Sequence, residues 1–140
     1  MRQILLFAAL AASLALLSGC TLSKTKKDTP EDMTGKAAYH KLSAEEAYEM
    51  MSSQEVVIVD VRTPEEYDGG HIENAVLVPN ESIDSEMPEA LPDKEATLLI
   101  YCRSGRRSKD AAQKLLALGY QSVYDFGGVI DWPYELVKEG

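Results

Sequence analysis

Three short and mostly apolar runs recur along the chain, and they constrain the fold more than any other feature. They occupy residues 56–61, 96–101 and 123–126. The run at 56–61 is rich in β-branched residues, as is typical of a strand that is covered on both faces. Residues 75–78 can form a further brief strand before Pro79. The chain is therefore expected to build a sheet with a buried interior.

Two capping boxes predict helices between these strands. Ser43 and Glu46 form the first box, at the start of a helix over residues 44–51. A second box begins at Thr63 and predicts the start of a short helix. The glycine pair at 69–70 is expected to end this helix.

Two further helices are predicted downstream. Apolar side chains recur at helical spacing over residues 108–118, and Gly119 follows as a stop signal. Residues 129–138 predict a closing helix, with Pro133 near its start. Strands that alternate with helices indicate an α/β fold with a mostly parallel central sheet and helices on both faces. In such sheets, ligands bind at the carboxyl ends of the strands.

The N-terminus has the pattern of a secretory signal peptide. Arg2 supplies a positive end, and residues 4–17 are almost entirely apolar. A membrane-spanning helix needs about 20 apolar residues, so this run is too short to span a bilayer. We therefore expect a signal peptide over residues 1–19.

The residues that end this apolar run, Leu17-Ser18-Gly19-Cys20, resemble a bacterial lipobox. The resemblance implies cleavage before Cys20 and attachment of lipid to its sulfur, which would hold the protein on a membrane. We expect an exported, membrane-anchored lipoprotein, and the sequence leaves open which membrane holds it. Residues 20–36 are charged and poor in large apolar side chains, so they are expected to form a lipidated tether before a domain over 37–140.

Length and charge limit the classes of function. The chain has 140 residues, which suits one domain after the signal and tether. Its net charge of −9 argues against nucleic acid as a partner, because binding it requires a basic face. Two cysteines and two histidines without a metal-ligand spacing give no reason to expect a metal or a cofactor. We expect the protein to act as a monomer.

The candidate nucleophile is Cys102, which directly follows the strand predicted over 96–101. The loop after it can turn backbone N–H groups inward at Gly105, and the helix expected from Ser108 directs its positive end at the same point. Such surroundings favour a thiolate and bind an anion. The candidate anion-binding residues are Arg103, Ser104, Gly105, Arg106, Arg107 and Ser108.

Three blocks of the chain resemble the rhodanese family. They are Asp60-Val61-Arg62 with Glu66-Tyr67 and Gly70-His71-Ile72, the loop from Cys102 to Ser108, and Leu118-Gly119-Tyr120 with Gly127-Gly128 and Trp132. The resemblance implies a rhodanese-like fold and a thiosulfate sulfurtransferase. In that reaction Cys102 takes a sulfane sulfur from a thiosulfate-like donor, as a persulfide, and passes it to a thiol or cyanide acceptor.

The resemblance also implies roles for other residues. Asp60 and Arg62 are expected to brace the loops at the active-site end, and Arg103 and Arg107 to steer the donor anion. Whether Arg62 or His71 contributes to catalysis stays open.

Two other functions remain as alternatives. The first is a cysteine-dependent phosphatase or arsenate reductase, whose loop resembles C-x₅-R. Here only four residues separate Cys102 from Arg107, and the shorter loop favours sulfur over a tetrahedral phosphate. The second is a non-catalytic or persulfide-carrying interaction module, against which the retained cysteine and cationic loop both argue.

Overall fold

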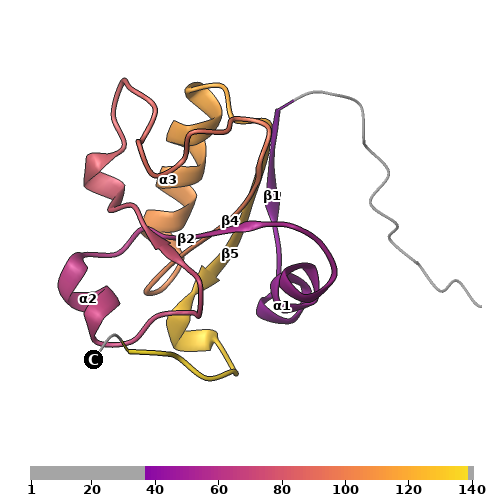
Figure 1. Cartoon of the computed structure of the whole chain (residues 1–140), viewed down its shortest axis with the longest axis vertical. Coiled ribbons are helices and arrows are strands. Elements are labelled where there is room, and N and C mark those ends of the chain that lie inside the picture. Colours follow the sequence, from indigo (N-terminus) through magenta and orange to yellow (C-terminus); the bar gives the residue numbers. More distant parts are fainter. Residues whose placement is uncertain (1–36, 139–140) are drawn as a thin grey trace, which may run out of the picture. The chain divides into compact units, whose positions relative to one another are not determined.

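The computed structural model describes residues 37–138, which form one five-stranded sheet flanked by helices (Figure 1). The strands are β1 (Ala38–Lys41), β2 (Val57–Asp60), β3 (Val76–Leu77), β4 (Thr97–Cys102) and β5 (Ser122–Gly128). The helices are α1 (Ala44–Ser53), α2 (Pro64–Asp68) and α3 (Arg106–Ala117), with 3₁₀ turns η1 (Asn80–Ser82) and η2 (Val129–Asp131). The strand order is β1-β5-β4-β2-β3, and every neighbouring pair is parallel. The predicted α/β fold is confirmed.

Helices cover both faces of the sheet, as predicted, because successive strand residues point to opposite sides. One face packs against α3 through Ala111, Ala112 and Leu115, together with Val59 and Ile100 of the sheet. The other face packs against α1 through Ala47, together with Ile58, Leu99 and Tyr101. In Figure 1 the two helices lie on opposite sides of the strands.

The carboxyl ends of all five strands meet at one edge of the sheet, because the strands are parallel. Cys102 is the last residue of β4, and Asp60 is the last residue of β2. The β4–β5 register shifts after Ile100, which sets Gly128 opposite Cys102. The candidate nucleophile therefore lies where a ligand is expected in a sheet of this kind.

The closing helix predicted over residues 129–138 is wrong. Only η2 forms, and it ends at Asp131. Pro133 lacks an N–H group and disfavours helical backbone at the residue before it, so the turn cannot extend into a helix. The chain continues in extended form, and Val137 exchanges two backbone hydrogen bonds with His71, at 2.9 and 2.8 Å.

Helix α3 begins at Arg106 rather than at the predicted Ser108. Gly105 stands at its N-cap with φ +98°, a left-handed conformation that favours glycine. As a result, Arg106 and Arg107 belong to the first helical turn, and the active-site loop is shorter than the sequence predicted.

The predicted signal peptide, the tether over 20–36 and the lipidation site Cys20 lie outside the described residues. Within residues 37–138, no helix is long and apolar enough to cross a membrane.

Candidate active site

The sulfur of Cys102 lies in a cradle formed by the loop that links β4 to α3. The residue is 1% exposed. The backbone N–H of Gly105 donates to its Sγ at 3.0 Å, and the thiol donates to the hydroxyl of Ser108 at 3.7 Å. The left-handed Gly105 turns the chain so that N–H groups at the start of α3 face inward. A strand end, a tight loop and a helix start thus converge on one sulfur atom.

This cradle changes the pKa of the Cys102 thiol. Burial alone would raise the pKa of the thiol. Hydrogen bonds from the backbone N–H and the hydroxyl of Ser108, and from the backbone N–H groups of Gly105 and Ser104, outweigh that effect and hold the pKa of Cys102 below its ordinary value. The cradle therefore increases the fraction of thiolate, the nucleophilic form, relative to a cysteine with an ordinary pKa.

Ser108 connects the nucleophile to a buried acid, Asp125 of β5. The Ser108 hydroxyl is fully buried and donates to Asp125 Oδ1 at 2.7 Å. The same carboxylate oxygen accepts the backbone N–H of Gly127 at 2.9 Å. Ser108, predicted as an anion-binding residue, therefore lies between Cys102 and a carboxylate.

The three arginines of the loop have different surroundings. Arg103 and Arg106 are exposed. Arg107, whose predicted role in steering the donor remains a prediction, donates twice to Glu66 of α2, at 2.7 and 2.8 Å. This bidentate pair raises the pKa of Arg107 and lowers that of Glu66 to about 2. The charge of Arg107 is therefore compensated, and Arg103 and Arg106 are the loop arginines open to solvent.

The Glu66–Arg107 pair predicts a stability loss in acid. Because the pKa of Glu66 is depressed from 4.5 to about 2, the pair stabilises the fold fully above pH 4.5, and this contribution is lost as the pH falls toward 2. The free energy of unfolding of Glu66→Gln should lie below that of the unmodified protein at neutral pH and converge with it in acid. Urea unfolding across this pH range measures the difference, and a gap that stays constant down to pH 2 would contradict the assignment.

Asp60 and Arg62 form a buried pair at the end of β2. The Arg62 Nε donates to both carboxylate oxygens of Asp60, at 2.9 and 3.0 Å, and its Nη2 donates to the carbonyl of Gly70 at 2.8 Å. Arg62 thereby ties β2 to the chain after α2, and its guanidinium lies 5.5 Å from the ring centre of Tyr101. The loop-bracing role remains a prediction, and these contacts are compatible with it.

His71 is buried, and it contacts α2 and the C-terminal segment. Its Nδ1 lies 3.0 Å from the carbonyl oxygen of Tyr67, and the two rings stack with centres 3.6 Å apart. Its backbone pairs with Val137. These contacts anchor the C-terminal segment to the end of α2.

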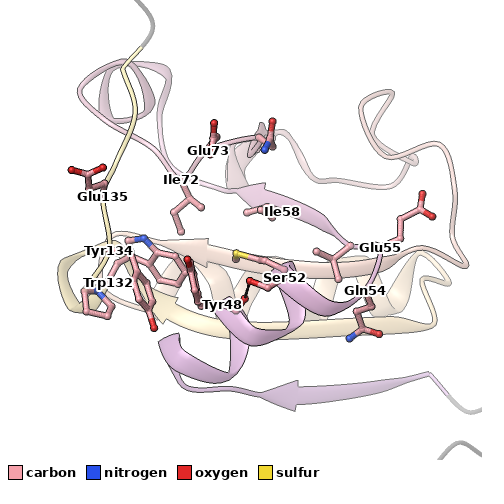
Figure 2. Close-up of a pocket in the computed structure, with 14 residues that line it drawn as sticks. Tyr48, Ser52, Gln54, Glu55, Ile58, Ile72, Glu73, Trp132, Tyr134 and Glu135 are labelled. Carbon is pink, nitrogen blue, oxygen red and sulfur yellow. Dashed lines mark hydrogen bonds between the residues drawn. The ribbon is translucent and has the colours of Figure 1, made fainter.

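A separate cavity of about 790 Å³ lies between α1, β2 and the C-terminal segment (Figure 2). Its apolar floor includes Ile58 and Ile72, and Tyr48, Trp132 and Tyr134 form an aromatic cluster at one end. None of the residues from Cys102 to Ser108 lines it. The cavity and the nucleophile are therefore separate features of the fold.

The structure brings to this site four side chains for which the sequence predicted no role there. They are Tyr39, Lys41, Glu66 and Asp125. Only Asp125 carried a signal, since an acid inside an apolar strand is rarely fully buried without a partner. The others come from elements whose position depends on the tertiary fold.

Comparison with known proteins matches residues 43–133 to the model of the rhodanese-like domain. A tRNA uridine(34) hydroxylase of Yersinia pestis is 32% identical over 106 residues, which cover 72% of this chain and 30% of that protein. The chain thus spans about a third of the length of the curated relatives it matches.

Solved structures share both sequence and fold with the chain. A rhodanese from E. coli, solved with anions, is 34% identical with a TM-score of 0.55, covering 61% of this chain and all of that one. A human single-domain sulfurtransferase is 26% identical with a TM-score of 0.58, covering 66% and 93%. The parallel sheet and the position of the cysteine at the end of β4 agree with the family match. The chain belongs to the rhodanese-like domain family.

Proposed function

We propose that the protein is a sulfurtransferase that moves a sulfane sulfur from thiosulfate or a similar donor to a thiophilic acceptor through a persulfide on Cys102. The observation that carries the proposal is the sulfur of Cys102 in its cradle of N–H donors, with Gly105 N at 3.0 Å. Such donors stabilise negative charge on sulfur before, during and after transfer. The curated relatives are named as tRNA hydroxylases, but this chain spans only 30% of their length. In addition, the net charge of −9 disfavours binding of tRNA by this chain.

The reaction would run in two displacements. In the first, the thiolate of Cys102 attacks the outer sulfur of thiosulfate, the sulfur–sulfur bond of the donor breaks, and sulfite leaves with the bonding electron pair. In the second, cyanide or a thiolate attacks the outer sulfur of the persulfide, and the thiolate of Cys102 is the leaving group. The cradle holds the anionic sulfur in both steps.

A direct assay tests this function. The purified protein is mixed with thiosulfate and cyanide, and thiocyanate is measured over time. Formation of thiocyanate above the uncatalysed rate supports the proposal. A folded protein that forms none with thiosulfate or 3-mercaptopyruvate would support an interaction module instead.

The exposed arginines predict a preference among donors. Thiosulfate is a dianion, and in a chain of net charge −9 its approach depends on local positive charge at Arg103 and Arg106. Arg103→Gln should lower kcat/KM for thiosulfate by about tenfold if the residue supplies about 1.4 kcal/mol in the transition state. Thiosulfate should outperform 3-mercaptopyruvate, and its rate should decline with ionic strength.

Lys94→Met is a control for this experiment. Lys94 is exposed and precedes β4, whereas the loop arginines follow that strand, so its loss changes net charge at the opposite end of the sheet. Equal losses in both variants, or rates indifferent to salt, would show that the arginines do not steer the donor.

We also propose that the chain is exported and anchored by lipid on Cys20, as its lipobox-like sequence indicates. Cys20→Ser should abolish incorporation of labelled palmitate and leave the precursor unprocessed. Cys102→Ser is the matched control, because it removes the other cysteine and should label normally. Undiminished labelling of Cys20→Ser would contradict the assignment.

A further inference from the structure

Behind the candidate nucleophile, a polar chain crosses the interior and ends at the surface on β1. Asp125 Oδ1 accepts from Ser108, and its Oδ2 accepts from the hydroxyl of Tyr39 at 2.7 Å and from Lys41 Nζ at 3.2 Å. Asp125 is 1% exposed, whereas the Lys41 side chain is 54% exposed. The contacts follow from the register, since Lys41 and Asp125 are partners on the parallel β1–β5 ladder.

A carboxylate buried this deeply needs compensation, because desolvation of an ion is costly unless it is paired and hydrogen-bonded. Lys41 supplies the opposite charge, and Tyr39, Ser108 and Gly127 N supply hydrogen bonds. This acid lies one hydroxyl away from Cys102, so it can influence the nucleophile through Ser108.

The influence passes through a single proton. The Ser108 hydroxyl has one hydrogen, so it cannot donate to Asp125 and to the sulfur of Cys102 at the same time. The carbonyl oxygens of Gly105 and Gly127 also lie near this hydroxyl, at 3.2 and 3.3 Å, but the carboxylate of Asp125 is closer, at 2.7 Å. When Cys102 is a thiol, it donates to Ser108, and Ser108 donates to Asp125. When Cys102 is a thiolate or a persulfide anion, the sulfur needs the hydrogen of Ser108. Asp125 then relies on its other donors.

We propose that Lys41 and Asp125 form a charge pair that controls the nucleophile Cys102 through the hydroxyl of Ser108. Lys41 and Asp125 are positioning residues, and this role rests on the sulfurtransferase function proposed above. The positive charge of Lys41 weakens the hydrogen bond that Asp125 accepts from Ser108. It also reduces the electrostatic repulsion between the carboxylate of Asp125 and an anionic sulfur on Cys102. The edge strand β1 thus supplies a residue that acts on the reaction without touching the substrate.

Other charged or titratable groups belong to the elements around the pair and the sulfur. They are Arg107 of α3 with its partner Glu66 of α2, the exposed loop residues Arg103 and Arg106, and Tyr39 of β1. Arg107 interacts electrostatically with Cys102 and favours the thiolate, whereas its side-chain hydrogen bonds are to Glu66. Burial, followed by the hydrogen bond and charge of Asp125, raises the pKa of Tyr39 to about 12, so Tyr39 stays a neutral donor across the range of the experiment.

The experiment measures the pH dependence of alkylation at Cys102 in the purified full-length chain, resolved from Cys20 by peptide mass spectrometry. Alkylation follows the thiolate fraction and requires no sulfur transfer, so it can fail independently of the proposed function. Lys41→Met should raise the apparent pKa of Cys102 and slow alkylation at neutral pH by about three- to fivefold, a modest effect because the lysine is partly exposed. Lys41→Arg should retain the unmodified profile.

A double-mutant cycle shows whether Lys41 acts through Asp125. Asp125→Asn should shift the apparent pKa of Cys102 downward, opposite to Lys41→Met, because it removes the repelling charge. In the Asp125→Asn background, Lys41→Met should have no further effect. Lys94→Met, the matched lysine control, should leave the profile unchanged.

Three outcomes would overturn the proposal. They are an unchanged profile in Lys41→Met, a Lys41 effect of equal size with and without Asp125, and an equal shift in Lys94→Met. If Asp125→Asn does not fold, the pH profiles of Lys41→Met, Lys41→Arg and Lys94→Met still test the proposal. These variants are expected to fold, because both lysines are exposed.

Discussion

Replacing Cys102 with serine is expected to lower sulfur transfer from thiosulfate to cyanide by on the order of 10³-fold or more. The hydroxyl of serine cannot form a persulfide, and no other cysteine among residues 37–138 can substitute for it. The side chain changes by one atom inside a cradle that offers the N–H of Gly105 and the hydroxyl of Ser108, and serine can use both. The effect should therefore fall on activity and spare the fold.

The free energy of unfolding separates these two effects. It should change by no more than about 1 kcal/mol in Cys102→Ser, as for a substitution that leaves volume and hydrogen bonding nearly unaltered. Thiocyanate formation is measured on the same preparation. Wild-type transfer by folded Cys102→Ser would falsify the assignment of the nucleophile.

The second large effect is expected at Gly128, where β5 passes directly beneath the active-site loop. A Cβ atom at this position would lie 2.5 Å from Ser104 Cα and 2.8 Å from the carbonyl carbon of Arg103. Both contacts are with backbone, which cannot rotate aside as a side chain can. Gly128→Ala should therefore displace the loop, at a cost of about 3 kcal/mol of stability for an overpacked buried site. It should also remove most activity, because the Gly105 N–H would leave the sulfur.

Gly69→Ala is the matched control for this substitution. Gly69 has φ −66°, and its Cβ would lie 3.4 Å from the nearest atoms, which is ordinary contact. Alanine there should be neutral or slightly stabilising. Urea unfolding and thiocyanate formation are measured on both variants. Equal stability of Gly128→Ala and Gly69→Ala would show that the loop does not require the close approach of β5.

The strands and helices that form the centre of the fold could be predicted because each carries its own local signal. The runs at 56–61, 96–101 and 123–126 correspond to β2, β4 and β5, and the capping box at Ser43 starts α1 where predicted. These signals depend on residues close in sequence. Tertiary contacts then reinforce them and leave their type unchanged.

Strand β1 (Ala38–Lys41) could not be predicted in the same way. It is four residues long at the edge of the sheet, its exposure alternates, and its sequence Ala-Tyr-His-Lys is not an apolar run. Its strand conformation comes from pairing with β5, a partner more than eighty residues away. The contacts of Tyr39 and Lys41 with Asp125 follow from that pairing and were missed with it.

The arginine loop shows the same limit at the level of the site. Its sequence located the positive charge near Cys102 but could not show that Glu66 compensates Arg107. That contact joins residues 41 positions apart and depends on how α2 packs beside the start of α3. The candidate nucleophile and its loop were visible in sequence, whereas the contact that compensates a charge of that loop required the fold.

The central claim, a persulfide on Cys102, is tested most directly by the mass of the peptide that contains this residue after incubation with thiosulfate. We expect a gain of one sulfur atom on that peptide, its removal by cyanide with release of thiocyanate, and no gain in Cys102→Ser. A peptide of unchanged mass, from a folded protein that still produces thiocyanate, would contradict the persulfide mechanism.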